Sequence, residues 1–303
     1  MRGLELLAGN PQTKHRLATG RGLSHAYILA GPPGCGKRTL AALLARALVC
    51  SGPADPPCGT CPDCRKALSG VHPDVIRVGT DGKDVNVAQV RQMRTDAYIR
   101  PNEAARKVYV VENAQTMNAS AQNALLKLLE DGPPYAAFLL LTDNAGAMLQ
   151  TVRSRCEVLT LSPVTPREAE ETLLSRYPGL PRDKVLDAAR RCEGVLGRAV
   201  AWLEGGGEEA EQVQAAAGTL VRLLKGGSEL ALLEYCVGLE KWDRDALAGL
   251  FDECVQQLRD GLVAGEEPKQ SLRLIGHLRR LKDALNYNAG AGHIAGWLCA
   301  GAR

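Results

Sequence analysis

The stretch AYILAGPPGCGKRT, residues 26–39, constrains the fold of this chain more than any other. Apolar residues 27–29 predict a short buried strand, and residues 39–48 predict the helix that follows. Between them, glycines let successive backbone N–H groups turn toward phosphate oxygens, while a lysine and a helix N-terminus add positive charge. The sequence therefore predicts a phosphate-binding loop formed by Gly31, Pro32, Pro33, Gly34, Cys35, Gly36 and Lys37.

One residue departs from this motif. The position after the lysine is normally Ser or Thr, whose hydroxyl binds Mg²⁺, and this chain has Arg38 there. Thr39 comes one residue late, so on a helix its side chain is rotated by about 100° from that position. The loop suits the phosphates of ATP or ADP, whereas the metal site is altered.

The composition is that of an ordinary globular protein. The chain has 303 residues, enough for two or three domains, and is 45% hydrophobic and 23% charged. A net charge of +3 is too small to require nucleic acid or a membrane as partner. We find neither a secretory leader nor a run long enough to cross a bilayer, so we expect a cytoplasmic protein with no membrane partner.

Apolar runs of strand length alternate with helical patterns through the first half of the chain. Residues 75–78, 107–111, 138–141 and 157–161 predict strands. Asn118 predicts the start of one helix between them. This alternation favours an α/β P-loop domain with a parallel sheet covered on both faces.

The second half shows only helical periods. Thr165 followed by Pro166 predicts a helix start and a domain boundary. We expect a P-loop domain over residues 1–162, a small helical lid domain over 163–204 and an all-helical C-terminal domain over 208–303, with a glycine-rich linker at 204–208. In the last domain two apolar stripes predict core-facing helices, Leu247, Leu250, Phe251, Cys254, Leu258 and Leu262 in one and Leu272, Ile275, Leu278, Leu281 and Leu285 in the other.

Four of the ten cysteines lie close together in a polar insertion at residues 50–64. The spacing of Cys50, Cys58, Cys61 and Cys64 predicts a closed tetrahedral Zn²⁺ site with a structural role. Four free thiols are the alternative, but this glycine- and proline-rich loop offers no apolar core in which to bury them. The spacing does not match the ferredoxin pattern of an iron–sulfur cluster.

Strand ends supply further polar candidates. Glu112 and Asn113 follow the strand at 107–111, where a P-loop ATPase carries Asp-Glu to hold Mg²⁺ and to activate water. Glu112 keeps a carboxylate, but Asn113 cannot act as a general base, so we predict that hydrolysis is lost. Thr142, at the end of the strand at 138–141, is a weaker candidate for a contact with the γ-phosphate.

Several arginines are also candidates. Arg155, in Ser154-Arg155-Cys156, could reach a neighbouring subunit's nucleotide site, and Arg198 could fold down on a nucleotide from the second domain. Both have the alternative of ordinary surface residues. A basic stretch lacks the interleaved aromatics of a stacking platform and more often forms a solvated face than a phosphate-backbone contact; its members are Arg91, Arg94, Arg100, Arg106 and Lys107.

Taken together, these motifs resemble the bacterial clamp-loader subunits, a family of AAA+ proteins, over nearly the whole chain. The residues that carry the resemblance are His25-Ala26-Tyr27 before GPPGCGK, the four-cysteine insertion, Asn123 to Lys127 (NALLK), Ser154-Arg155-Cys156 and Gly197-Arg198-Ala199. The resemblance implies a subunit of a five-membered ring with gamma or tau and delta subunits, which loads a sliding clamp onto primer–template DNA within a replicative DNA polymerase holoenzyme. It also implies that the C-terminal domains form a collar and that Arg155 is an arginine finger acting in trans, a contribution of about 10³–10⁵ in rate.

The departures at Arg38, Glu112 and Asn113 favour the member of this family that does not hydrolyse ATP. Nucleotide binding without turnover, or weak binding, is compatible with the intact loop. Two alternatives stay open. One is a hydrolysing gamma- or tau-type subunit that uses Thr39 as a displaced metal ligand, and the other is a zinc-dependent nucleic-acid-binding module.

Overall fold

The structure is a computed structural model that describes residues 1–19, 22–53, 55–79, 84–205, 207–263, 268–286 and 291–300. It divides into two compact units, residues 1–200 and residues 201–303. The division lies close to the linker predicted at 204–208, of which Gly206 is outside the described residues. The separate lid domain remains a prediction.

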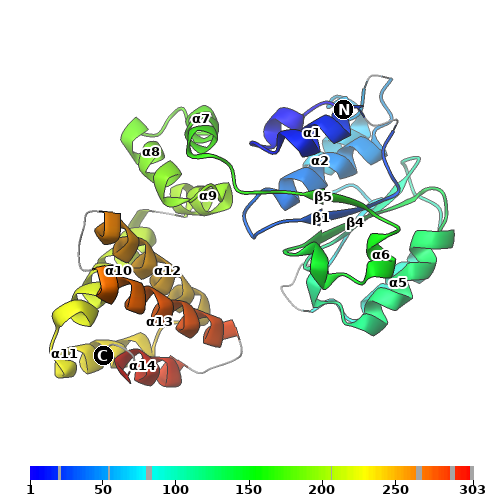
Figure 1. The fold of residues 1–303 in the computed structure, drawn as a ribbon. Coiled ribbons are helices and arrows are strands. Elements are labelled where there is room, and N and C mark those ends of the chain that lie inside the picture. Colours follow the sequence, from blue (N-terminus) through cyan, green and yellow to red (C-terminus); the bar gives the residue numbers. More distant parts are fainter. Residues whose placement is uncertain are drawn as a thin grey trace. The chain divides into compact units, whose positions relative to one another are not determined.

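A five-stranded parallel sheet forms the centre of the first unit (Figure 1). The strands are in the order β2-β3-β4-β1-β5, and every pairing is parallel, which confirms the predicted α/β P-loop fold. The predicted strands at 75–78 and 107–111 have the observed bounds, and the other strands differ by one or two residues at their ends. The strands are β1 (Ala26–Ala30), β2 (Val75–Val78), β3 (Lys107–Val111), β4 (Ala136–Thr142) and β5 (Glu157–Thr160).

Helices cover both faces of this sheet (Figure 1). They begin where the sequence supplies caps: the side chain of Asn118 accepts the N–H of Ala121 at the start of α5, as predicted. The elements are η1 (Leu4–Leu6), α1 (Pro11–Thr19), α2 (Lys37–Val49), α3 (Pro62–Leu68), α4 (Val87–Ala97), η2 (Ala114–Thr116), α5 (Ala119–Asp131), η3 (Ala145–Ala147) and α6 (Gln150–Arg153).

Alternate residues of β1 point into two different cores. Ala26, Ile28 and Ala30 pack with α4, α5 and α6, whereas Tyr27 and Leu29 pack with α1 and α2. All five residues are buried, because a strand in the interior of a sheet covered on both faces has no solvent side. The phosphate loop therefore begins at the end of a fully buried strand.

Side chains of the first helix cover the outer edge of β5. Thr13 Oγ1 donates to the carbonyl of Thr160 at 3.0 Å, and an Arg16 guanidinium nitrogen donates to the carbonyl of Val158 at 3.2 Å. Arg16 also forms an ion pair with Glu157 at 2.7 Å. The edge carbonyls that no neighbouring strand reaches are thus satisfied from α1.

The first unit ends in three helices, α7 (Pro166–Arg176), α8 (Arg182–Arg191) and α9 (Leu196–Glu204), the last of which runs into the second unit. The start of α7 is a capping box in which Thr165 and Glu168 bond each other's backbone N–H, with Pro166 at the first helical position. The predicted cap is confirmed.

The second unit is entirely helical over its described residues. The predicted α12 stripe is confirmed: residues 247, 250, 251, 254 and 258 are buried, and Leu262 is partly buried against them. The prediction for Leu272 is wrong, because this side chain is 61% exposed and lies about 120° around the helix from Leu278; Leu274 takes the core position instead. The helices are α10 (Gly207–Gly226), α11 (Glu229–Leu239), α12 (Arg244–Val263), α13 (Pro268–Asn286) and α14 (Ala291–Ala300).

Within the described ranges, none of the helices combines the length and the apolar character that crossing a bilayer requires.

Candidate nucleotide cleft and four-cysteine cluster

The phosphate loop between β1 and α2 requires glycine at two positions. A Cβ on Gly31, whose φ is 155°, would lie 2.3 Å from the carbonyl oxygen of Leu161. Gly36 is in the left-handed region, with φ of 92°, and its C-terminal neighbour Lys37 begins α2. The loop can therefore adopt this conformation only with glycine at these two positions, because a side chain would clash at Gly31 and strain the backbone at Gly36.

A cavity of about 500 Å³ opens beside this loop, which is within the range of small-molecule sites. Most of the predicted site residues line it. Asp143 and Gln115 also line it and were not predicted; Asp143 directly follows β4, a strand-end position that could have indicated it. The predicted residues on the lining are Pro33, Gly34, Cys35, Gly36, Lys37, Arg38, Thr39 and Glu112.

Two oxygen atoms hold the ammonium group of Lys37 beside the phosphate loop. Its Nζ donates to the carbonyl of Gly31 at 2.5 Å and lies 2.7 Å from Oδ1 of Asp143. Gln115 Nε2 donates to the other carboxylate oxygen of Asp143 at 3.3 Å. The lysine is thus fixed at the position from which it could meet a phosphate.

Arg38 and Glu112 form an ion pair across the cleft. The Nε and one terminal nitrogen of Arg38 lie 2.9 and 2.7 Å from Oε2 of Glu112, whose side chain is only 6% exposed. A terminal nitrogen of Arg77, on the edge strand β2, lies 3.8 Å from Oε1 of the same carboxylate. Glu112 is therefore neutralised by guanidinium groups.

This arrangement does not fit a magnesium ion. P-loop ATPases hold Mg²⁺ with a Ser or Thr hydroxyl after the lysine and a carboxylate from the neighbouring strand. In this chain the guanidinium of Arg38 stands in place of the hydroxyl and forms an ion pair with the carboxylate of Glu112. Thr39 lines the cleft, but the side chain that meets Glu112 is Arg38.

The strand ends beside the cleft differ in what they offer. Asn113 lines the cleft and has a φ of 53°, in the left-handed region. Thr142 is buried; its hydroxyl donates to the carbonyl of Asn144 at 2.9 Å, and Thr142 is not among the lining residues. At this strand end Asp143, rather than Thr142, faces the cavity.

The residues before and in α9 meet the phosphate loop directly. The N–H of Gly197 donates to the carbonyl of Gly34 at 2.9 Å, and a Cβ on Gly197 would lie 2.6 Å from the Cα of Gly34. Arg198 lies outside the cavity lining and within 3.4 Å of Glu193. Burial raises the pKa of the Cys35 thiol, and the charges of Lys37 and Arg198 oppose that rise.

Arg155 lies just past the short helix α6, on the surface of the first unit. Its guanidinium donates to the carbonyl of Thr151 at 2.8 Å and forms an ion pair with Glu130 at the end of α5. The side chain is 35% exposed. It is therefore ordered and accessible at the same time.

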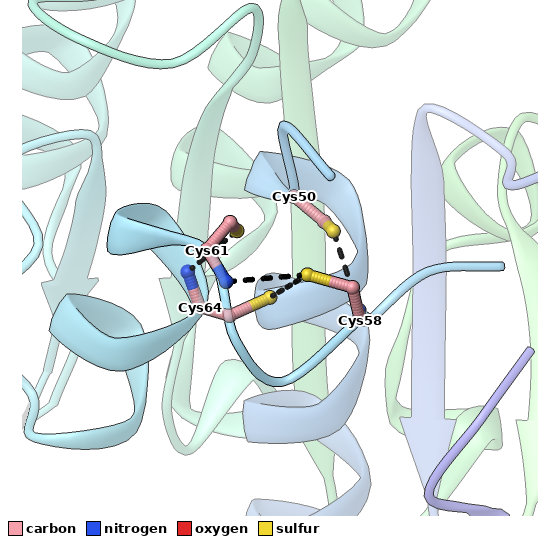
Figure 2. Close-up of side chains that lie close together, drawn as sticks. All are labelled: Cys50, Cys58, Cys61 and Cys64. Carbon is pink, nitrogen blue, oxygen red and sulfur yellow. Dashed lines mark hydrogen bonds between the residues drawn. The ribbon is translucent and has the colours of Figure 1, made fainter. Parts of the chain in front are cut away.

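The four cysteines gather at the end of α2 and the start of α3 (Figure 2). Their sulfur atoms all lie within 4.8 Å of one another, and those of Cys58 and Cys64 are 4.0 Å apart. A tetrahedral zinc ion with bonds of about 2.3 Å needs sulfurs about 3.8 Å apart. The cluster fits such an ion in number, type and spacing of donors.

Backbone N–H groups support negative charge on this cluster. The N–H of Cys61, followed by the contacts of Thr60, lowers the pKa of Cys58 to about 5. Burial raises the pKa of Cys64 to about 12, and a bound dication would reverse that effect. The lowered pKa of Cys58 favours a thiolate ligand, whereas the Cys64 thiol needs the charge of a bound metal ion to deprotonate.

A second group near this cluster, Asp63, His72 and Glu103, is a poorer metal site. His72 Nδ1 accepts the N–H of Asp74 at 3.0 Å, so in the neutral ring Nε2 carries the proton. Nε2 faces Asp63 Oδ1 at 3.4 Å. In that tautomer Nε2 offers no lone pair to a metal ion.

The predicted basic stretch is not continuous on the surface. Lys107 is buried, and its ammonium lies 2.9 Å from Asp96, which also accepts a hydrogen bond from Tyr109 at 2.6 Å. It cannot contribute to a solvated face or to a phosphate-backbone contact, so its inclusion in that stretch is wrong.

Comparison with known proteins extends this picture. A family model described as DNA polymerase III, delta subunit, matches residues 11–165. The subunit delta' of DNA polymerase III from Pseudomonas aeruginosa is 34% identical over 247 residues, which cover 76% of this chain and 69% of that protein. This chain belongs to the DNA polymerase III subunit delta' family.

Other relatives match a shorter part of the chain. The subunit delta' of Bacillus subtilis is 34% identical over 154 residues, and the chain spans about half the length of this relative and of the Haemophilus influenzae one, 47% in each. The subunit tau of Bacillus subtilis is 33% identical over 143 residues, which cover 47% of this chain and 25% of that protein. Among solved structures, a DNA polymerase III gamma subunit-related protein from Thermotoga maritima is 18% identical and covers 97% of this chain and 99% of its own, with a TM-score of 0.48.

Proposed function

We propose that this protein is the delta' subunit of a bacterial clamp loader and that it does not hydrolyse ATP. In this proposal it joins gamma or tau and delta subunits in a five-membered ring in the cytoplasm. The ring opens a sliding clamp and places it on primer–template DNA during replication. The relatives named as subunits of DNA polymerase III support this assignment.

The observation that carries the proposal is the ion pair between Arg38 and Glu112. A guanidinium at 2.7 Å from Oε2 of Glu112 offsets the negative charge that would attract Mg²⁺, and Asn113 cannot take a proton from water at neutral pH. Both functions that hydrolysis needs are therefore missing. The loop itself is intact, so we propose that it still binds ATP or ADP, weakly or without turnover.

Arg155 would then serve a neighbour's site in trans. Its support is structural: the guanidinium is ordered by Glu130 and Thr151 and still accessible. An arginine finger contributes about 10³–10⁵ in rate at the site that receives it.

The test is DNA-stimulated ATP hydrolysis by the reconstituted ring. With Arg155→Ala, we expect the ATP site of the adjacent subunit to stop hydrolysing, so that the total rate loses the contribution of that site. Arg153→Ala, two residues away on the exposed end of α6, is the matched control and should leave the rate unchanged. Equal rates for both variants would contradict the assignment of Arg155.

The second unit would form part of the collar. Three apolar side chains on α11, Leu230, Leu233 and Val237, are each more than half exposed and share one helix face. Leu233→Asp should therefore weaken co-purification with the gamma or tau and delta subunits while the chain stays folded. Unchanged co-purification would argue against this face as the contact.

The proposed metal is a structural zinc ion held by Cys50, Cys58, Cys61 and Cys64. Its four donors leave no open coordination position, so it would order the loop and take no part in chemistry. Metal analysis of the reduced protein should find one zinc ion per chain.

A hydrolysing gamma- or tau-type subunit is the second candidate. The similarity to tau and the position of Thr39 on the cleft wall support it. In that case the isolated chain would turn over ATP, and Lys37→Ala would abolish the activity.

A further inference from the structure

More cationic than anionic side chains line the cleft beside the phosphate loop. Among the described residues that line it, Lys37, Arg38 and Arg176 are cationic and Glu112 and Asp143 are anionic. Arg77 lies just behind Glu112, at 3.8 Å. The formal charges of these five lining side chains sum to +1.

Arg38 has the geometry to serve a phosphate. It is in the first turn of α2, directly after Lys37, and its side chain is 76% exposed although its guanidinium is anchored on Glu112. Only Nε and one terminal nitrogen point at the carboxylate, so the other terminal nitrogen still has N–H groups to donate. A fixed guanidinium suits the bidentate recognition of phosphate.

We infer that the cleft binds a nucleoside di- or triphosphate as the metal-free anion, with the guanidinium of Arg38 in the role that Mg²⁺ has in ATPases. This inference deepens the proposed nucleotide binding and rests on it. The phosphate charge is compensated by Lys37 and Arg38, and Glu112 keeps Arg38 in place.

Binding of the magnesium complex should be no better, and we expect it to be weaker. Mg²⁺ demands near-octahedral oxygen coordination, and the carboxylate that could contribute an oxygen is occupied. A dication on the phosphates would also lie beside the guanidinium of Arg38 and repel it. Chelation should therefore leave the nucleotide bound.

The experiment is calorimetric titration of the full-length protein with ADP, once in excess Mg²⁺ and once in EDTA. The affinity in EDTA should equal or exceed that in Mg²⁺. Arg38→Ser should lower the affinity in EDTA by about 10- to 100-fold, the range for a lost charged hydrogen bond. The same variant restores a hydroxyl after the lysine and should bind ADP more tightly with Mg²⁺ than without it.

Two further variants complete the design. Arg182→Ser removes an equal charge from an exposed position of α8 and should leave both affinities unchanged. Glu112→Gln removes the negative charge next to the phosphates but keeps a side-chain oxygen that can accept from Arg38, so it should tighten the binding of metal-free ADP, a shift opposite to that of Arg38→Ser.

Three results would overturn the inference: ADP binding that requires Mg²⁺, unchanged binding by Arg38→Ser in EDTA, or no ADP binding under either condition. None of these would affect the role proposed for Arg155, which is measured on a neighbour's ATP in the reconstituted ring. Conversely, an inactive finger with EDTA-resistant ADP binding would leave this inference standing.

Discussion

The carboxylate of Glu130, in the last turn of α5, holds the guanidinium of Arg155 beyond α6. The two side chains are similarly accessible, at 39% and 35%, so the pair lies on the surface and not in the core. If Arg155 acts on a neighbour's ATP, Glu130 is a positioning residue for it. An arginine that is already ordered loses less conformational freedom when it meets the reacting phosphate.

Replacing Glu130 should therefore impair the ring without unfolding the subunit. For Glu130→Gln we expect DNA-stimulated ATP hydrolysis by the reconstituted complex to fall by about three- to tenfold at the affected site, less than for Arg155→Ala, because the guanidinium remains but is less well positioned. The KM for ATP should hardly change, whereas kcat should drop. Asp131→Gln, a like charge on the next residue of α5, is the control, and an equal effect of both variants would contradict a specific role.

Asp74 should stabilise the first unit in a pH-dependent manner. Its buried carboxylate accepts the backbone N–H groups of Asn102, Glu103 and Ala104 at 2.6–2.9 Å. Burial by itself would raise the pKa of Asp74, but these three donors outweigh it and hold that pKa below its usual value. Asp74→Asn should lower the free energy of unfolding at neutral pH by about 1–3 kcal/mol.

The sign of the pH effect follows from that lowered pKa. An unfolded aspartate titrates near pKa ~3.9, so the contribution of the folded carboxylate is complete above that pH and is lost as the pH falls through the folded pKa. The stability difference between wild type and Asp74→Asn should stay constant from neutral to mildly acidic pH and shrink below about pH 4. Denaturant unfolding at several pH values measures it, with Asp55→Asn at an exposed position as control; a difference that grows in acid would contradict the account.

Removing one sulfur should remove the zinc ion. With Cys58→Ala we expect loss of bound zinc and a less stable first unit, by about 3 kcal/mol or more, because a closed site orders a loop with little core of its own. Zinc content and the thermal midpoint are the measurements. Cys299→Ser, a cysteine outside the cluster, should keep both values, and a Cys58→Ala protein that retains stoichiometric zinc would argue against the four-sulfur site.

The contact between Gly197 and Gly34 leaves no room for a side chain. Gly197→Ala would place a Cβ 2.6 Å from a backbone atom, so the start of α9 has to move away from the phosphate loop. We expect a loss of about 1–3 kcal/mol in stability and faster hydrogen exchange of the residue-197 amide. Gly179→Ala, where a Cβ meets nothing within 4 Å, is the control; protection of the amide at 197 in both variants would refute the expected displacement.

Much of the fold could be predicted because its signals are local. The strand Lys107–Val111 is apolar or aromatic after its first residue, and Asn118 and Thr165 are caps whose side chains bond N–H groups three residues away. Leu272 was misplaced because it follows the three-residue spacing of Ile275 and Leu278. A three-residue spacing falls about 60° short of a full turn at each step, so Leu272 lies off the face on which Leu274 and Leu278 are buried.

The candidate site was only partly predictable because its decisive contacts are distant in the sequence. The residue types at 38 and 112 already indicated a lost metal site, yet nothing in the sequence places their side chains 2.7 Å apart. Asp143 was missed in favour of Thr142, since adjacent residues at a strand end face different sides. The burial of Lys107 was missed because a charged side chain is usually expected on the surface.

The hydrogen bonds from α1 to the rim of β5 have a consequence for the behaviour of the protein outside its assembly. Thr13 and Arg16 occupy backbone acceptors that would otherwise attract a strand from another molecule. A variant truncated at its amino terminus would keep most of its core but expose an unpaired strand edge. Such a variant would aggregate at high concentration before its circular-dichroism spectrum loses any helical signal.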